Sequence, residues 1–176
     1  MTSAPPATGL DAAIREIQRL EEDSIHSGKG HFNAAARWSH VHLWLGIPAA
    51  LLAALAGASA WKNLPDLVAA LALVASGLTA VLTFLNPQQR HTAHAQAGAK
   101  FFAIRDEARV LGEVELRNGL SPADAVARVK DLSKRRSELN LTSPPIPAHA
   151  YRQARRGIAA GEAAYAVDAP APKTRR

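Results

Sequence analysis

Two long apolar segments occupy the middle of the chain, and no formal charge interrupts either of them. Residues 41–61 and 67–86 contain no Asp, Glu, Lys or Arg, whereas a soluble amphipathic helix carries a charged face. With a rise of 1.5 Å per residue, Val41–Trp61 and Leu67–Leu85 would be about 31 and about 28 Å long, which matches the roughly 30 Å hydrocarbon core of a bilayer. The pattern predicts a transmembrane helix at 41–61, an external turn at 62–66 and a second transmembrane helix at 67–86.

The residues that flank these segments predict their orientation. Trp38, Trp44 and Trp61 lie at or near the ends of the first segment, where indole rings favour the membrane interface. Basic residues precede the first segment and follow the second, whereas the turn holds only Lys62. These flanking residues are Lys29, Arg37, Arg90, Lys100, Arg105 and Arg109. The positive-inside rule therefore predicts that both termini are cytoplasmic. The alternative, a soluble protein with a buried hairpin, needs a shell of further helices that the rest of the chain is too short to supply.

Upstream of the hairpin the sequence predicts an amphipathic helix. Residues 1–8 are predicted to be a disordered lead, and 9–40 a cytoplasmic amphipathic helix with the entry to the first span. The helix itself is expected over 9–27, on an apolar stripe with helical spacing. The glycine-containing stretch "SGKGHF" is expected to break it, and a second helix is expected to start near His31. The stripe consists of Leu10, Ile14, Ile17 and Leu20, with Ile25 as a further candidate member.

Residues 87–142 are predicted to form a cytoplasmic helical hairpin. Its first helix is expected at roughly 88–117, on an apolar stripe spaced 4, 3, 4, 3 as in a coiled coil, which would pack within one chain or pair two chains. Its second helix is expected at 122–140, with Ser121 as the N-cap and Pro122 at the first helical position. The stripe comprises Ala97, Phe101, Ile104, Ala108 and Leu111.

The chain is predicted to close with a basic helix. Residues 143–168 are predicted to contain a linker followed by this helix, which is expected at about 148–166. Residues 169–176 are predicted to be a disordered tail. Its apolar stripe is Tyr151, Ile158 and Tyr165, and its basic patch is Arg152, Arg155 and Arg156. The patch has three interpretations: contact with anionic lipid headgroups, contact with nucleotide phosphates, or a solvated face. Together the elements predict an all-α fold, a two-span transmembrane helical hairpin continuous with a cytoplasmic helical bundle.

Composition and motifs narrow the function. The chain has no cysteine, which excludes disulfides and thiolate metal sites, and its net charge of +6 comes mostly from residues near the C-terminus. A basic end suits membrane lipid, and no nucleic-acid partner and no cofactor are predicted. The pairs His40/His42 and His91/His94 have no carboxylate near them in sequence, so no metal site is predicted. No nucleophile motif, phosphate loop or paired-carboxylate pocket is evident, so the chain is not predicted to be an enzyme.

The two spans contain candidate functional residues. A polar stripe on the second span, spaced 3, 4, 3, would either form hydrogen bonds between helices or line a water-filled path when several copies assemble. Pro48 predicts a kink in the first span, as a gating hinge or as tolerated local geometry. Three leucines of the first span are candidates for an apolar gate, because an apolar constriction excludes water. The stripe is Ser76, Thr79, Thr83 and Asn86, and the candidate gate is Leu45, Leu52 and Leu55.

Three stretches carry a resemblance to a known family. They are "GHFNAAARWSHVHLWLGIPAALLAALAG", "FLNPQQRHTAHAQAGAKFFAIRDEARVL" and "IPAHAYRQARRGIAAGEAAY". Over residues 10–168 the chain resembles the SLATT family, the SMODS- and SLOG-associating two-transmembrane effector domains of bacteria. The resemblance implies an oligomeric effector of an anti-phage conflict system that permeabilises or depolarises the inner membrane, in response to a nucleotide second messenger or an associated sensor protein. The alternative is a non-conducting membrane scaffold whose cytoplasmic bundle docks a partner protein.

Overall fold

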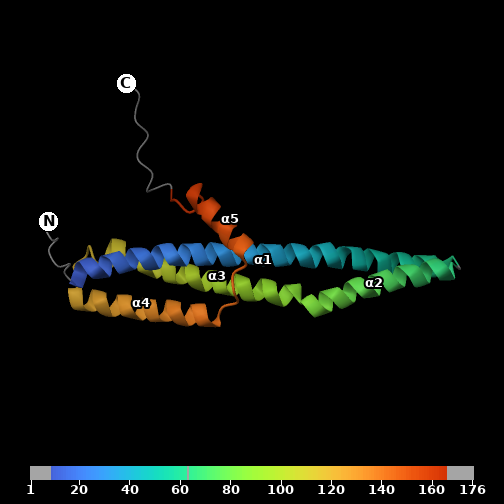
Figure 1. Ribbon diagram of the computed structural model, residues 1–176, viewed down its shortest axis with the longest axis horizontal. Helices are drawn as coiled ribbons and strands as arrows, with labels where there is room; N and C mark the ends of the chain where they lie inside the picture. Colours follow the sequence, from blue (N-terminus) through green and yellow to red (C-terminus); the bar gives the residue numbers. More distant parts are fainter. Residues whose placement is uncertain (1–8, 63, 166–176) are drawn as a thin grey trace, which may run out of the picture. The chain divides into compact units, whose positions relative to one another are not determined.

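The computed structural model describes residues 9–62 and 64–165, and all regular structure in these residues is helical (Figure 1). The elements are α1 (Gly9–Trp61), α2 (Pro65–Leu85), α3 (Pro87–Val110), a π-helical turn (Leu111–Glu115), α4 (Pro122–Thr142) and α5 (Ala148–Ala159). The all-α prediction is confirmed. The predicted lead and tail lie outside the described residues.

The chain divides into two compact units. One, called the bundle unit here, combines Met1–Asn33 with Gln96–Arg176. The other, called the hairpin unit, is Ala34–Ala95 and contains the second half of α1, all of α2 and the start of α3. In the hairpin unit α2 runs back beside the second half of α1 (Figure 1).

The prediction that "SGKGHF" breaks the first helix is wrong, because α1 is helical from Gly9 through Trp61. The glycines serve close packing. A Cβ atom at Gly28 would lie 2.5 Å from the Phe102 ring, and one at Gly98 would lie 3.1 Å from the Phe32 ring and 3.2 Å from the Gly28 carbonyl oxygen. The Phe32 and Phe102 rings also contact each other, with their centroids 5.3 Å apart. This packing offsets the roughly 1 kcal/mol that each glycine costs a helix relative to alanine.

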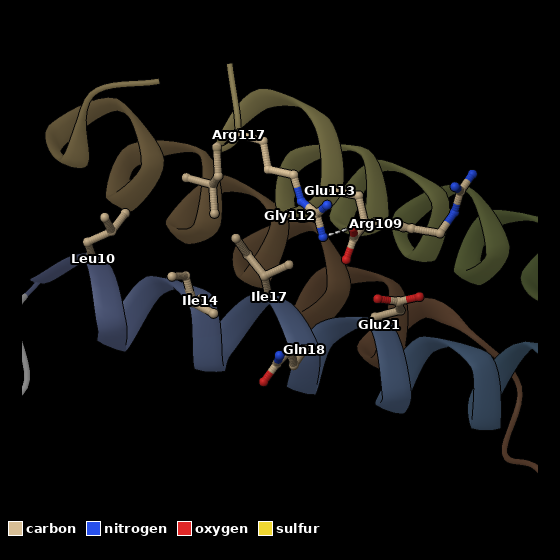
Figure 2. A pocket seen from close by; sticks show the side chains of 10 residues that line it. Leu10, Ile14, Ile17, Gln18, Glu21, Arg109, Gly112, Glu113 and Arg117 are labelled. Atoms are coloured by element: carbon tan, nitrogen blue, oxygen red, sulfur yellow. Dashed lines mark ion pairs between the residues drawn. The ribbon is translucent and has the colours of Figure 1, made fainter. Parts of the chain in front are cut away.

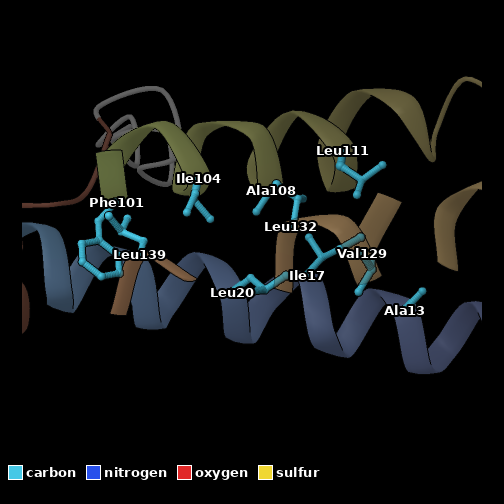
Figure 3. Packing of buried hydrophobic residues seen from close by; sticks show 10 residues of the cluster. All are labelled: Ala13, Ile17, Leu20, Phe101, Ile104, Ala108, Leu111, Val129, Leu132 and Leu139. Atoms are coloured by element: carbon cyan, nitrogen blue, oxygen red, sulfur yellow. The ribbon is translucent and has the colours of Figure 1, made fainter. Parts of the chain in front are cut away.

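The core of the bundle unit lies between α1, α3 and α4 (Figure 3). The stripe predicted on the third helix is buried: Ala97, Phe101, Ile104, Ala108 and Leu111 are each at most 5% exposed. Four of them share a cluster with residues from α1 and α4; its members are Ala13, Ile17, Leu20, Phe101, Ile104, Ala108, Leu111, Val129, Leu132 and Leu139. The stripe therefore packs within one chain, which was one of the two alternatives.

Of two predicted helix ends in the bundle unit, one is confirmed and the other differs. The Ser121 side chain accepts a hydrogen bond from the Asp124 backbone N–H, so the predicted N-cap of α4 is confirmed. The helix expected at 88–117 is α-helical only to Val110, after which the π-helical turn Leu111–Glu115 follows.

The closing helix differs from its prediction in length and in its buried face. It ends at Ala159 rather than near residue 166, because Gly161 adopts a left-handed conformation with φ +88° that stops the helix. Its buried residues are small: Ala150, Ala154 and Gly157. The predicted stripe of Tyr151, Ile158 and Tyr165 is wrong, since Tyr151 is 42% exposed and Tyr165 lies beyond the helix.

Candidate functional site

The apolar hairpin is the most distinctive surface of the molecule. Two helices are long and apolar enough to cross a membrane, and only 11% and 6% of the residues in their apolar stretches are buried. Large apolar side chains point away from the hairpin, including Trp44, which is 79% exposed, and Phe84, which is 88% exposed. The others include Leu43, Ile47, Leu51, Leu55, Leu67, Leu73, Val74 and Val81. A continuous apolar surface of this kind marks a membrane or protein contact.

The two helices of the hairpin turn one face each toward the interior of the unit. On α2 the less exposed positions are spaced 4, 3, 4, 3, as in a coiled coil. They are Leu71, Ala75, Leu78, Leu82 and Leu85, and their counterparts on α1 are Leu45, Ala49, Leu52, Ala56 and Ser59. The faces touch near Gly46, where a Cβ atom would lie 3.9 Å from Leu82 Cδ1.

The structure brings together two of the three candidate gate residues. Leu45 and Leu52 are half-buried on the interior face of α1, two turns apart. Leu55 is 55% exposed and points away from that face. Pro48, the candidate hinge, is half-buried inside α1, which continues through it without interruption. Its role as a hinge stays a prediction.

The polar stripe of α2 lies on an exposed side of the helix. Ser76, Thr79, Thr83 and Asn86 are all exposed. The three hydroxyls donate to carbonyl oxygens of their own helix, each at 2.9 Å: Ser76 to Leu73, Thr79 to Ala75 and Thr83 to Thr79. The Asn86 amide donates to Gln89 Oε1 at 2.6 Å. Among the described residues of the hairpin, the hydrogen bonds of the stripe stay within its own helix or reach Gln89, and none crosses to α1. The role of the stripe as a pore lining or as a contact between helices stays a prediction.

The base of the hairpin is the end opposite the turn, where α2 joins α3 beside Ala35 and Trp38 of α1, and a positively charged side chain contacts both helices there. Asn86 ends α2 in a left-handed conformation with φ 43°, and α3 begins at the next residue. Arg90, one turn into α3, donates from Nε to the Leu85 carbonyl oxygen at 2.9 Å, and its guanidinium lies 4.9 Å from the Trp38 ring centroid. His91 Nδ1 lies 2.9 Å from the Ala35 carbonyl oxygen; a carbonyl can only accept, so Nδ1 carries the proton and donates.

The histidines do not form a metal cluster in the part of the chain that the structure describes. No group of three or more His, Cys, Asp or Glu is placed to hold an ion there. Burial, together with the positive charge of Arg90, lowers the pKa of His94. His94 is therefore neutral over a wider pH range than a free imidazole.

The bundle unit contains a groove of about 400 Å³ between α1 and the end of α3 (Figure 2). Its apolar wall is formed by α1 side chains, and its rim carries charges of both signs. Burial raises the pKa of Glu21 at one end, and the nearby charges of Arg105 and Arg109 offset part of that effect. Between Ile17 and Glu21, Arg117 forms an ion pair with Glu113 (Figure 2). The lining residues are Leu10, Ile14, Ile17, Gln18, Glu21, Arg109, Gly112, Glu113, Leu116 and Arg117.

The arginines of α5 and the arginine at position 105 in the bundle unit differ in their exposure. Arg152, Arg155 and Arg156 are exposed on α5, and none forms an ion pair with another described residue. Arg105, in contrast, is only 9% exposed, and its guanidinium lies 5.2 Å from the Tyr165 ring and 5.5 Å from the Phe102 ring. The sequence identified Arg105 only as a flanking basic residue. Its burial could not be predicted, because Tyr165 is 60 residues away in the chain.

No protein-family model matches the chain, and no curated protein or solved structure is significantly similar to it.

Proposed function

We propose that this protein is an oligomeric membrane effector whose hairpin spans the bilayer and conducts ions when several copies assemble. The observation that carries the proposal is the exposed apolar surface on both helices of the hairpin unit, with a polar stripe beside it. Exposing a large apolar side chain to water costs about 1.5–3 kcal/mol, and at least ten such side chains are exposed here. A bilayer removes that cost, and both helices have the length to span it.

Orientation follows from charge. The turn between the helices contains Lys62, whereas the base of the hairpin contains Arg37 and Arg90. The positive-inside rule favours a cytoplasmic location for the base, the bundle unit and both termini, with the turn on the other side of the membrane. The resemblance to SLATT effectors suggests that this membrane is a bacterial inner membrane.

Conduction requires several copies, because two helices enclose no lumen. The stripe of Ser76, Thr79, Thr83 and Asn86 is available for this role, since it is exposed and does not bind the partner helix of its own hairpin. Hydroxyl and amide groups carry no net charge, so such a lining discriminates poorly among small ions. The resulting activity is depolarisation rather than selective transport.

The biological role comes from the resemblance to SLATT effectors. It suggests that the protein acts in anti-phage defence, and that a nucleotide second messenger or a sensor protein triggers it. The bundle unit is the part that would receive this signal, because it is the larger, charged unit outside the proposed membrane span.

Membrane flotation of the full chain tests the first step. A protein that stays in the dense fraction of a lipid gradient, and that is soluble without detergent, contradicts the membrane assignment and favours the soluble alternative.

Ion flux from liposomes tests the second step. Thr79→Leu with Thr83→Leu removes two hydroxyls from the stripe and should abolish flux while insertion and assembly persist. The matched control is Val74→Leu with Val81→Leu, two exposed positions of α2 off the stripe, which should conduct like the parent. Equal flux from both double variants would mean that the stripe does not line the path.

A non-conducting scaffold is the second candidate, and the groove of the bundle unit favours it. The groove presents an apolar wall with a charged rim, which is a suitable surface for a partner protein. Absence of flux from assembled wild-type protein, with capture of a partner through the bundle unit, would select this function.

A further inference from the structure

We infer that Arg90 and Trp38 form a binding site for the phosphate of an anionic phospholipid headgroup at the base of the hairpin. The inference rests on the proposed membrane span and names a specific lipid contact within it. Arg90, Trp38 and Leu85 belong to the hairpin unit, so the site is complete within that unit.

The guanidinium of Arg90 is held in place by two contacts. Its Nε donates to the Leu85 carbonyl oxygen at 2.9 Å, and its Cζ atom lies 4.9 Å from the Trp38 ring centroid. Leu85 is the last residue of α2, so this hydrogen bond satisfies a helix-end carbonyl that would otherwise lack a partner. The terminal nitrogens of Arg90 donate no hydrogen bond to any described residue, and the side chain is exposed. An arginine oriented in this way presents two parallel N–H groups, which is the geometry that binds a phosphate bidentately.

No carboxylate of the hairpin unit competes for this arginine. Between Ala34 and Ala95 the only acidic residue is Asp66, at the opposite end of α2. The 21 residues of α2 separate Asp66 from the base by about 30 Å. Arg37, also exposed, adds a second positive charge to the base. The counter-ion for this positive charge must therefore come from outside the unit.

The position of the site selects a lipid over a soluble anion. Arg90 follows the apolar helix α2 by one turn, and Phe84, 88% exposed, precedes it on that helix. In a bilayer this places the guanidinium at headgroup depth and Phe84 among the acyl chains. A zwitterionic headgroup carries a cationic amine in addition to its phosphate. The hairpin unit has no carboxylate near Arg90 that could bind this amine. The fit is therefore to an anionic headgroup such as phosphatidylglycerol.

Native mass spectrometry of the full chain in detergent, with equal amounts of phosphatidylglycerol and phosphatidylcholine, tests the inference. The wild-type protein should retain phosphatidylglycerol preferentially. Arg90→Gln should reduce that preference by about fivefold or more, the effect of one basic residue at a lipid surface. Arg90→Lys should give a partial loss, because an ammonium keeps the charge but not the bidentate geometry. The matched control, Arg15→Gln, removes an exposed arginine of α1 from the bundle unit and should leave the preference unchanged.

The results that would contradict the inference can be told apart. An equal loss in Arg15→Gln would show a general charge effect and overturn the site. Displacement of the lipid by millimolar inorganic phosphate would show a soluble-anion site and overturn the lipid assignment. Arg90→Gln that floats with liposomes and retains phosphatidylglycerol like the wild type overturns this inference alone, whereas a wild-type chain that does not float overturns the proposed function as well. Circular dichroism of each variant verifies that it is folded.

Discussion

Replacing Phe101 by alanine should destabilise the bundle unit by about 3–5 kcal/mol, the usual cost of removing a buried aromatic side chain. Phe101 is 1% exposed, stacks on the His31 ring with centroids 5.4 Å apart, and belongs to the cluster shared by α1, α3 and α4. An aromatic side chain removes about 150–250 Å² from water, which at about 25 cal/mol per Å² gives an upper limit of about 4–6 kcal/mol. Alanine retains part of this burial, and the empty volume that it leaves adds to the loss.

Hydrogen exchange of the α4 amides in detergent measures this effect, because Leu132 and Leu139 of α4 pack in the same cluster. A loss of 3 kcal/mol or more increases the population of the open state at least about a hundredfold, so the protection of α4 should fall by that factor. Phe84→Ala is the matched control: it is the same substitution at a side chain that is 88% exposed in the hairpin unit, and α4 should be unaffected. If Phe101→Ala dissociates the oligomer while α4 stays protected, Phe101 belongs to a contact between chains and the reasoning is refuted.

Three further predictions concern the bundle unit. Ser121→Ala removes the N-cap of α4 and should cost about 1 kcal/mol, measured as earlier thermal unfolding; an unchanged midpoint would contradict the capping role. The two hydrogen bonds from Arg135, both at 2.6 Å, lower the pKa of Glu107, so this pair should stabilise the fold above the ordinary carboxyl pKa and lose its effect as the pH falls through the lowered value. Both side chains are more than 40% exposed, so Glu107→Gln should cost less than about 1 kcal/mol at pH 7 and nothing in acid, measured by unfolding at both pH values. Gly161→Ala places a side chain at φ +88° and should cost about 1 kcal/mol, with faster exchange at the end of α5 as the measurement.

The sequence predicted the elements whose signals are local. The cap at Ser121 and the apolar stripe from Ala97 to Leu111 could both be identified, because each depends on residues within one or two turns. Helical spacing alone also predicted which side of the third helix is buried. The charge-free lengths identified the two apolar helices for the same reason.

The remaining features depend on residues far apart in the sequence. The glycines of "SGKGHF" were predicted to end a helix because glycine has low helix propensity, but Phe102 and Gly98 of α3 provide the packing that keeps α1 helical there. The orientation of the hairpin faces could not be predicted, since its helices are apolar all round and several stripes share the same spacing. The apolar stripe of the closing helix was predicted from large side chains spaced by seven residues. The helix instead packs through the small side chains of Ala150 and Ala154, which allow a close approach to its neighbours.

The order of residues in the bundle unit has a consequence for synthesis. Its core joins Ile17 and Leu20 to residues that follow the hairpin, so the 62 residues of Ala34–Ala95 must be translated before that core can begin to close. At about 5–20 residues per second this interval is about 3–12 s. During it the apolar stripe of the first helix has no partner within the chain, while the hairpin itself emerges from the ribosome. The core of the bundle unit therefore closes only after the whole hairpin unit has been synthesised, so the chain cannot fold strictly in order from its N-terminus.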